Sequence, residues 1–369
     1  MKILMFSADP TILDKESSAS RRMVEYGRRV ERLDVLVLTS RAAVKQSSGG
    51  GVAGNVLVRA FTGKFMRFPK AFFAAWRALK SEKYDLLTAQ DIEHAFICRL
   101  LSKSFKVKWQ MQIHADIFSP FFTRHSMFNK MRAMLAKFLI PRASCIRVVS
   151  ERIKKSIIRK FNNLGGKIIV LPILAESADL NVEPKVFPEF DKTILMVSRL
   201  TSEKNIGLAL DAIAEVIKGH PKTGLIIVGD GSEREALELK ADSLQLTANI
   251  KFEGWQKNTA QYYKGANIFL LTSRYEGWGM SAVEAMRYGA AVVMADVGLA
   301  GEFVEDGKNG LIIPVNDKDA LVAAILRLLE NDELRRDLAE AAAEKVKKLA
   351  SEEDYYGRIV ESWKKCSNF

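Results

Sequence analysis

The chain has 369 residues, of which 48% are hydrophobic and 27% are charged, so a chain disordered throughout is excluded. This length is enough for about two domains. No apolar run approaches the length of a membrane-spanning helix or of a signal peptide, and we expect a cytoplasmic protein. The three cysteines, Cys98, Cys145 and Cys366, are too widely spaced for a disulfide framework or a zinc cluster. We expect Cys98 and Cys145 to be buried as small hydrophobic residues.

Basic and acidic residues are divided unevenly along the chain, whose net charge is +12. Residues 1–180 contain 32 Lys and Arg against 14 Asp and Glu, whereas residues 181–369 contain 24 and 30. Such an asymmetry favours two modules with different partners. A basic half suits nucleic acid, an anionic membrane or a phosphate-bearing ligand, and charge alone does not choose among them.

Short apolar runs alternate with helical periodicity through the first half of the chain. The expected strands are residues 2–7, 33–39, 55–60, 84–89, 107–113, 145–149 and 167–171. Helices are expected at 17–32, 69–81, 92–102 and 150–161, and a glycine-rich loop at 47–54. Because most of the strands are almost continuously apolar, they are typical of a parallel sheet that helices cover on both faces.

The stretch 175–190 breaks this alternation with two prolines and mixed charge, and we interpret it as a linker. After it come expected strands at 193–197, 224–228, 250–252, 268–271, 291–294 and 311–313, with helices at 206–218, 233–243, 281–288, 320–329, 332–350 and 352–365. The alternation in both halves predicts an α/β protein with two doubly wound parallel sheets. We place the domains at 1–178 and 179–350, and expect a C-terminal helical segment, 351–369, to pack back on the first domain.

The most informative segment carries two carboxylates and two glycines between an apolar strand and a helix, where doubly wound sheets bind their ligands. Gly277 and Gly279 let a ligand approach the backbone, and the helix start offers free N–H groups to a phosphate. Glu276 and Glu284 flank this anion site, which favours a ligand with sugar and ribose hydroxyls beside its phosphates. For Glu284 alone, a capping box with Ser281 is an alternative.

Further segments match motifs of one known family and occur in that family's order. They are 197–200 with 203–205, 228–232, 252–255 and 306–314. With them the chain resembles glycosyltransferase family 4, whose members are retaining enzymes of the GT-B fold. The resemblance implies two Rossmann-like domains that face each other across a cleft. It also implies a nucleotide-diphosphate sugar as the donor.

The resemblance implies a role for each residue of the donor site. Glu276 and His114 are the expected catalytic residues, both in contact with the donor. Arg199 and Lys204 are expected to bind the phosphates with Gly277, Trp278, Gly279, Met280 and Ser281, whereas Glu284, Gly229, Gly254 and Trp255 are expected to bind ribose and base. Alternatives are a surface role for the two cations, a packing role for Trp255 and a buried or helix-capping role for His114.

The first domain is expected to bind the acceptor, through loops that follow its strands. The acceptor-side candidates are Asp9, Ser17, Ser18, Asp91 and Asp116. Residues 9–18 stand where many family members have a pair of glycines. Asp91 is equally suited to cap the helix expected at 92–102.

No Asp-x-Asp motif lies near the expected donor site, and the one at 317–319 precedes a helix, where a carboxylate caps well. We therefore expect no metal and no cofactor besides the nucleotide-sugar co-substrate. The cations Arg199 and Lys204, with the helix N-terminus, are sufficient to hold the charge of the diphosphate.

The stretch 119–160 contains 11 Lys and Arg, one acid, Glu151, and many interleaved aromatic and large apolar residues. This pattern favours an interfacial helix on an anionic membrane, and we expect the protein on the inner face of the cytoplasmic membrane. The alternative is that the apolar face is ordinary core. Nucleic acid is not expected as a partner, because no recognition motif for it is present.

These observations predict a retaining glycosyltransferase that moves a sugar from a nucleotide-diphosphate sugar to an acceptor, such as a lipid-linked or envelope glycan precursor. A nucleotide-sugar epimerase of the same fold is one alternative. The other is an inactive module that binds nucleotide-sugars and docks on membranes.

Overall fold

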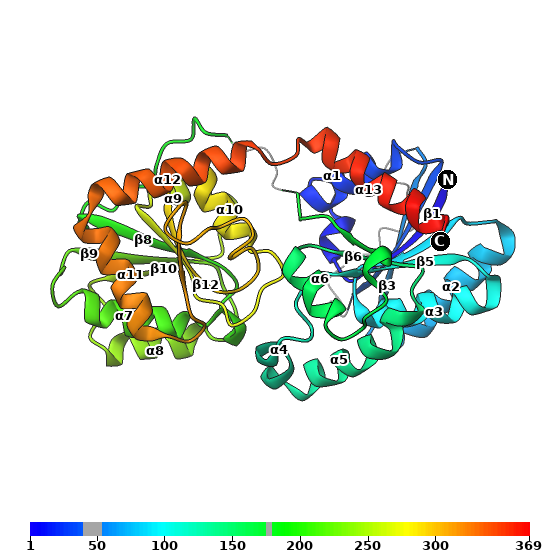
Figure 1. Cartoon of the computed structure of the whole chain (residues 1–369), viewed down its shortest axis with the longest axis horizontal. Coiled ribbons are helices and arrows are strands. Elements are labelled where there is room, and N and C mark those ends of the chain that lie inside the picture. Colours follow the sequence, from blue (N-terminus) through cyan, green and yellow to red (C-terminus); the bar gives the residue numbers. More distant parts are fainter. Residues whose placement is uncertain (40–53, 175–178) are drawn as a thin grey trace. The chain divides into compact units, whose positions relative to one another are not determined.

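The computed structural model of the chain describes residues 1–39, 54–174 and 179–369, which form two compact units (Figure 1). Unit 1 comprises Met1–Pro172 and Ala350–Phe369, and unit 2 comprises Ile173–Leu349. The predicted loop 47–54, apart from Gly54, and the first residues of the predicted linker lie outside the described residues. The chain therefore passes from unit 1 to unit 2 and returns at its end.

In the described part of the chain, unit 1 is built on a seven-stranded sheet with the order β3-β2-β1-β4-β5-β6-β7. Its strands are β1 (Lys2–Ser7), β2 (Arg32–Thr39), β3 (Val56–Thr62), β4 (Leu86–Ala89), β5 (Lys108–Ile113), β6 (Cys145–Val148) and β7 (Ile168–Val170). All neighbours pair in parallel. The central strands are buried on both faces, which explains why the sequence of β1 is almost continuously apolar.

Helices cover both faces of this sheet (Figure 1). On one face, α1 (Ser18–Gly27) contacts α13 (Glu352–Ser367). On the other face, α2 (Arg67–Ser81), α3 (Ile92–Phe105) and α5 (Met127–Leu139) contact one another in this order. Two further helices are short. Helix α4 (Pro120–His125) precedes α5, and helix α6 (Glu151–Ile158) follows β6. Side chains of Ser17, Asp91, Ser126 and Ser150 cap α1, α3, α5 and α6.

Unit 2 has, among its described residues, a six-stranded parallel sheet with the order β10-β9-β8-β11-β12-β13. Its strands are β8 (Lys192–Val197), β9 (Thr223–Val228), β10 (Ile250–Gly254), β11 (Ile268–Leu271), β12 (Ala291–Ala295) and β13 (Leu311–Ile313). Its helices are α7 (Ile206–Val216), α8 (Arg234–Ser243), α9 (Ala260–Gly265), α10 (Met280–Arg287), α11 (Lys318–Glu330) and α12 (Asp332–Lys347). Apolar side chains of β8, β9 and β11 pack against α7 and α11 in the main core.

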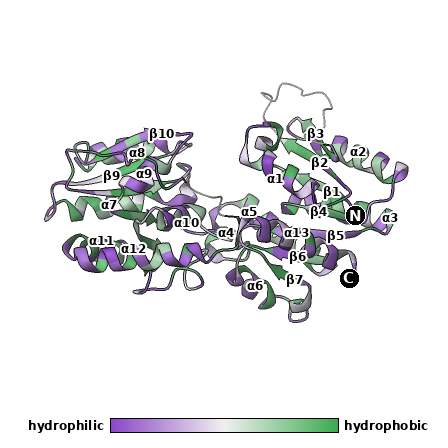
Figure 2. Ribbon diagram, turned by 90° about the horizontal axis from the view of Figure 1, so that it is seen from above, coloured by the Kyte–Doolittle hydropathy of each residue, from purple (hydrophilic) through white to green (hydrophobic). Residues whose placement is uncertain are grey.

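Hydropathy follows this layering in both units (Figure 2). The strands are mostly hydrophobic, and the helices combine a hydrophobic side with a hydrophilic one, as expected for helices packed on a sheet. No helix in the described ranges is both long and apolar enough to cross a lipid bilayer.

Cys145 is buried, as expected, but it is not a free thiol, because it forms a disulfide with Cys366. The two residues are 221 positions apart in the sequence, and their Cα atoms lie 5.4 Å apart. Spacing along the chain does not reveal the pair, because only the return of α13 to unit 1 brings Cys366 beside β6. Cys98 is buried with a free thiol, as expected.

Candidate active site

The predicted donor-side residues of unit 2 lie along one edge of its sheet, beyond the carboxyl ends of the strands. Arg199 follows β8, Gly229 follows β9, Gly254 ends β10 and Glu276 follows β11. Because these four strands are parallel neighbours, the loops that follow them are adjacent. In doubly wound sheets this edge is the one that binds ligands.

Lys204 and Glu276 form an ion pair at this edge. Lys204 Nζ lies 2.5 Å from Glu276 Oε1, and the two side chains are only 18% and 15% exposed. Ser273 Oγ donates a hydrogen bond of 2.8 Å to the same carboxylate oxygen. Thr272 Oγ1 donates to the backbone oxygen of Lys204 at 2.9 Å and so ties the Lys204 loop to the end of β11. A cation and a carboxylate are thus held together close to the start of α10.

The start of α10 offers backbone N–H groups to a ligand. Its N-cap is Gly279, with a φ of 105°, and no side chain within the described residues caps the helix. A side chain at this position would be strained, and its Cβ would lie 3.3 Å from Leu299. The capping-box alternative is wrong, because Ser281 lies inside the helix and not at its N-cap. The free N–H groups and the helix dipole make this end attractive to an anion.

Glu284 is oriented by a tyrosine. Tyr263 Oη donates a hydrogen bond of 2.7 Å to Glu284 Oε2, and the Tyr263 ring stacks on Tyr288 with its centroid 6.0 Å away. Burial and the neighbouring Glu284 carboxylate raise the pKa of Tyr263, so the phenol stays a donor at neutral pH. Glu284 is therefore placed as an acceptor for hydroxyl groups.

Arg199 is held differently from Lys204. Its side chain is 75% exposed and pairs with Glu203 at 3.3 Å. Burial opposes ionisation of Glu203, but neighbouring hydrogen-bond donors and the charges of Arg199 and Lys204 together lower its pKa. The Arg199 loop packs directly on the β9–α8 loop, because a Cβ at Gly229 would lie 1.8 Å from the backbone oxygen of Ser198.

Two aromatic residues of the predicted site have different surroundings. Trp255, next to Gly254, is 71% exposed, so the packing alternative for it is wrong. Trp278 is buried, with its ring near Phe303, and only its backbone is available to a ligand. Gly254 accepts a hydrogen bond from the N–H of Gly229 at 2.8 Å, which joins the two predicted nucleotide-side loops.

The acceptor-side candidates of unit 1 lie beyond the carboxyl ends of β1, β4 and β5, which are neighbours in the sheet. Asp9 accepts a hydrogen bond from the N–H of Thr11 at 3.0 Å, and Asp116 accepts one from Ser156 Oγ at 2.7 Å. Ser17 caps α1, of which Ser18 is the first residue, and Asp91 caps α3. The capping role of Asp91 is thus confirmed. Its other carboxylate oxygen lies 2.7 Å from Nδ1 of buried His94. Burial opposes ionisation of Asp91, but the hydrogen bond and charge of His94 lower its pKa overall.

His114 follows β5 and its side chain reaches solvent, so the buried alternative is wrong. Crowding by the surrounding protein, together with the positive charge of Arg147, nevertheless lowers the pKa of the imidazole. His114 is therefore neutral at neutral pH and offers one donor and one acceptor.

Two sequence models of known families match the chain in succession. A Glycosyl transferase 4-like domain matches residues 18–173, and Glycosyl transferases group 1 matches residues 178–345. The chain belongs to the family 4 type of glycosyltransferase. Its two parallel-sheet domains are those of the GT-B fold.

This glycosyltransferase is 32% identical over 160 residues to alpha-monoglucosyldiacylglycerol synthase of Acholeplasma laidlawii. The match covers 43% of the chain and 40% of that relative's length. Among solved structures, the fold is similar to sucrose-phosphate synthase from Thermosynechococcus elongatus, with a TM-score of 0.81, 21% identity, and coverage of 99% and 98% of the two chains. It is also similar to Anabaena HepE in complex with UDP-glucose, with a TM-score of 0.74, 22% identity and 99% of each chain covered.

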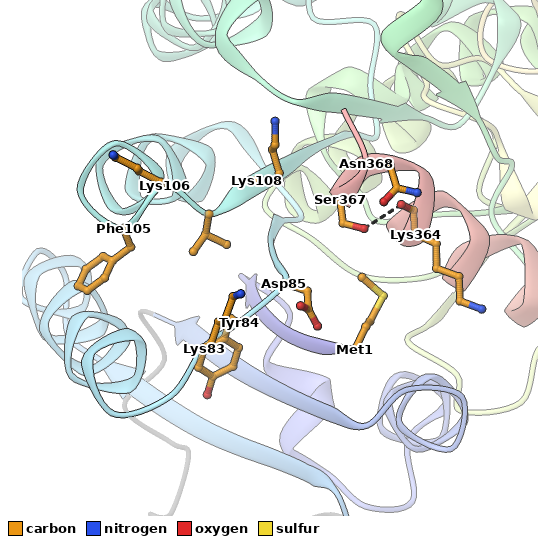
Figure 3. Close-up of a pocket in the computed structure, with 11 residues that line it drawn as sticks. Met1, Lys83, Tyr84, Asp85, Phe105, Lys106, Lys108, Lys364, Ser367 and Asn368 are labelled. Carbon is orange, nitrogen blue, oxygen red and sulfur yellow. Dashed lines mark hydrogen bonds between the residues drawn. The ribbon is translucent and has the colours of Figure 1, made fainter.

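A cavity of about 670 Å³ lies elsewhere in this glycosyltransferase, at the amino-terminal edge of the unit 1 sheet (Figure 3). Lysines 83, 106, 108 and 364 line it, together with Asp85. Figure 3 shows the side chains of Lys106, Lys108 and Lys364 extending outward in different directions. They do not converge on one point, and the cavity is at the wrong edge of the sheet for the predicted site.

Sequence reasoning missed two residues that support the predicted site. Tyr263 lies in α9, a helix of six residues that was too short to be recognised by its periodicity. Arg147 stands inside the buried strand β6 and donates hydrogen bonds of 2.9 Å to Gln112 and to Tyr355 of α13. A lone arginine in an apolar run was the available signal, since a buried charge needs partners.

Proposed function

We propose that this protein is a retaining hexosyltransferase that uses a nucleotide-diphosphate sugar and no metal. The observation that carries the proposal is the group formed by the Lys204–Glu276 pair, the open start of α10 and the oriented carboxylate of Glu284. These elements offer, along one edge, a cation and N–H donors for phosphates and two carboxylates for hydroxyl groups.

We propose uracil as the donor base, and the donor is then a UDP-hexose. HepE, which shares the fold, has been captured with UDP-glucose. In this chain the proposed base-side surface is the exposed ring of Trp255 with the joined loops at Gly229 and Gly254. Arg199 adds a second, solvent-facing cation at the same edge.

In the proposed reaction, the bond between the anomeric carbon and the diphosphate oxygen breaks while the acceptor hydroxyl attacks from the same face. The departing diphosphate takes up the hydroxyl proton, and Lys204 with the N–H groups of α10 stabilises its negative charge. Glu276 holds the sugar, and neutral His114 of unit 1 is proposed to touch the donor.

The proposed acceptor is a lipid-linked or other envelope glycan precursor, because the name of the Acholeplasma relative describes a glycolipid synthase. Asp9, Ser17, Ser18, Asp91 and Asp116 are its proposed contacts. We also propose an anionic membrane surface as a partner and the inner face of the cytoplasmic membrane as the location.

A panel of nucleotide-sugars, offered with and without lipid-linked acceptors, tests this function. UDP release that depends on the acceptor supports transfer, and NMR of the anomeric proton in the product shows whether the configuration is retained. A changed sugar on the nucleotide with no transfer would indicate an epimerase. Binding without turnover for every donor and acceptor would indicate an inactive module.

A further inference from the structure

The positive charge of unit 1 is concentrated on one of its two helix layers. Helices α2, α3 and α5 together contain nine Lys and Arg and one acid, Glu93. Helices α1 and α13, on the opposite face, contain five basic and five acidic residues. Glu93 is paired with Arg132 and so joins α3 to α5. We call α2, α3 and α5 the basic layer.

The basic layer and the residues that flank its helices also expose large apolar side chains. Eleven of the sixteen exposed large hydrophobic residues in the described ranges lie between residue 65 and the end of α5. They are Phe65, Met66, Phe73, Phe96, Leu100, Phe121, Met127, Phe128, Met131, Met134 and Phe138. The alternative that the apolar residues of 119–160 are ordinary core is therefore wrong for the outer face of α5. The residues of α5 that are buried against the rest of unit 1 include Ala133, Ala136 and Leu139.

Cations and apolar groups alternate on this surface, and several of the cations have no acid beside them among the described residues. Lys70, Lys130 and Lys137 are exposed, and none of them pairs with an acid in the part of the chain that the structure describes. Met131 and Met134, with exposures of 59% and 62%, lie between Lys130 and Lys137 on α5. Such a surface can insert its apolar side chains while its ammonium groups stay at the level of lipid phosphates.

We infer that the basic layer of unit 1 docks flat on an anionic lipid bilayer. A second copy of the chain is disfavoured as the occupant, because two basic layers face to face would repel each other. A protein partner is disfavoured because lysine is depleted from the buried centres of protein interfaces. An anionic bilayer satisfies both the charge and the apolar surface.

Docking on this layer also places an acceptor-side residue near the lipid. Asp91 caps α3, and the exposed Phe96 lies five residues further along the same helix, about 7.5 Å along its axis. Phe68 of α2 packs on His94 with ring centroids 6.0 Å apart, and His94 pairs with Asp91. The geometry points to an amphiphilic acceptor whose headgroup is taken directly from the bilayer, and this step rests on the proposed function.

Flotation of the full chain with vesicles tests the docking surface. We expect binding to phosphatidylcholine mixed with phosphatidylglycerol, weak binding to phosphatidylcholine alone, and release by salt, which screens charges beyond about 8 Å. Lys130→Gln with Lys137→Gln should weaken binding roughly 30-fold, because each lysine contributes about a factor of five at an anionic surface. Met131→Gln with Met134→Gln should weaken it roughly 10-fold through lost apolar insertion.

The matched control is Leu239→Gln with Lys347→Gln, an exposed apolar and an exposed basic residue of unit 2. It should bind vesicles like the unaltered protein, and thermal melting should show that all variants are folded. Equal binding to both vesicle types, no binding to either, or a dimer that Met131→Gln with Met134→Gln dissociates would each overturn the inference. If vesicle binding behaves as expected but no UDP-sugar is cleaved, the docking surface stands and the proposed function fails.

Discussion

The two units differ in whether their basic residues are paired with acidic ones. At the ligand edge of unit 2, Lys204 is matched by Glu276 and Arg199 by Glu203. On the basic layer of unit 1, one acid stands against nine cations. Paired charges at fixed distances favour a ligand of defined geometry, whereas an unpaired excess attracts any large anionic surface at long range. The ligand edge of unit 2 is therefore suited to one kind of ligand, whereas the basic layer of unit 1 is suited to anionic surfaces in general.

The largest effect is expected for Glu276→Gln, which keeps the size of the side chain but removes the charge from the Lys204 pair. Turnover of the donor should fall about 10²–10³-fold, as for other groups that act on the reacting centre, while affinity for UDP should hardly change. Steady-state kinetics and calorimetric titration measure the two quantities. Glu238→Gln on the exposed face of α8 is the control, and equal kinetics for both variants would remove Glu276 from the site.

Separate substitutions of Lys204 and Arg199 compare how much each cation contributes to UDP binding by unit 2. Lys204→Ala should weaken UDP binding by about 1.5–3 kcal/mol, because it loses a charge-assisted contact in a largely buried position. Arg199→Ala should cost less than about 1 kcal/mol, since its exposed charge is screened by solvent. Calorimetric titration with UDP decides the order, and unchanged affinity in both variants would reject the phosphate assignment.

Tyr263→Phe removes the hydroxyl that orients Glu284 and leaves the ring stack on Tyr288 in place. We expect UDP binding to weaken by about 0.5–1.5 kcal/mol, the usual contribution of one hydrogen bond. Tyr262→Phe, which changes the neighbouring residue of α9, should leave UDP affinity unchanged. If Tyr263→Phe lowers the melting temperature and leaves UDP affinity intact, the role of Tyr263 is only structural.

No effect on UDP binding is expected from the last change, which lies in unit 1, where Asp91 both caps α3 and pairs with His94. Asp91→Ala should cost about 1–2 kcal/mol of stability, and Asp91→Asn less, because asparagine also caps helices. Since folding lowers the pKa of Asp91, the contribution of its charge is present above the unfolded carboxyl pKa of about 3.9 and is lost as the pH falls through the lower folded value. Urea unfolding at pH 7 and pH 3 should show the difference in stability between the unaltered protein and Asp91→Asn shrinking at the lower pH.

The parts of the fold that depend on local pattern could be predicted from the sequence. The strand expected at 193–197 is β8, Lys192–Val197, because a buried parallel strand must be apolar on both faces. The helix expected at 92–102 continues to Phe105 and ends at Lys106, which takes a left-handed conformation that a non-glycine residue adopts only in suitable surroundings. Helix ends depend on such surroundings and not on periodicity alone.

The contacts that hold the candidate site could not be predicted in the same way. The order of Glu276, Glu284 and the glycines was visible in the sequence, but the Tyr263–Glu284 hydrogen bond joins α9 to α10 through tertiary packing. The capping box was compatible with the sequence, and only the backbone conformation of Gly279 moves the N-cap away from Ser281. The Cys145–Cys366 bond likewise depends on where α13 returns.

That return makes unit 2 an insertion within unit 1, because the chain leaves unit 1 after Pro172 and re-enters it at Ala350. A protease that cuts one of these two crossings leaves the units covalently joined through the other. Cutting both frees unit 2, yet α13 stays attached to the sheet of unit 1 through Cys145–Cys366 until a reductant is added. On a gel, the same digest should therefore give two fragments without reductant and three with it.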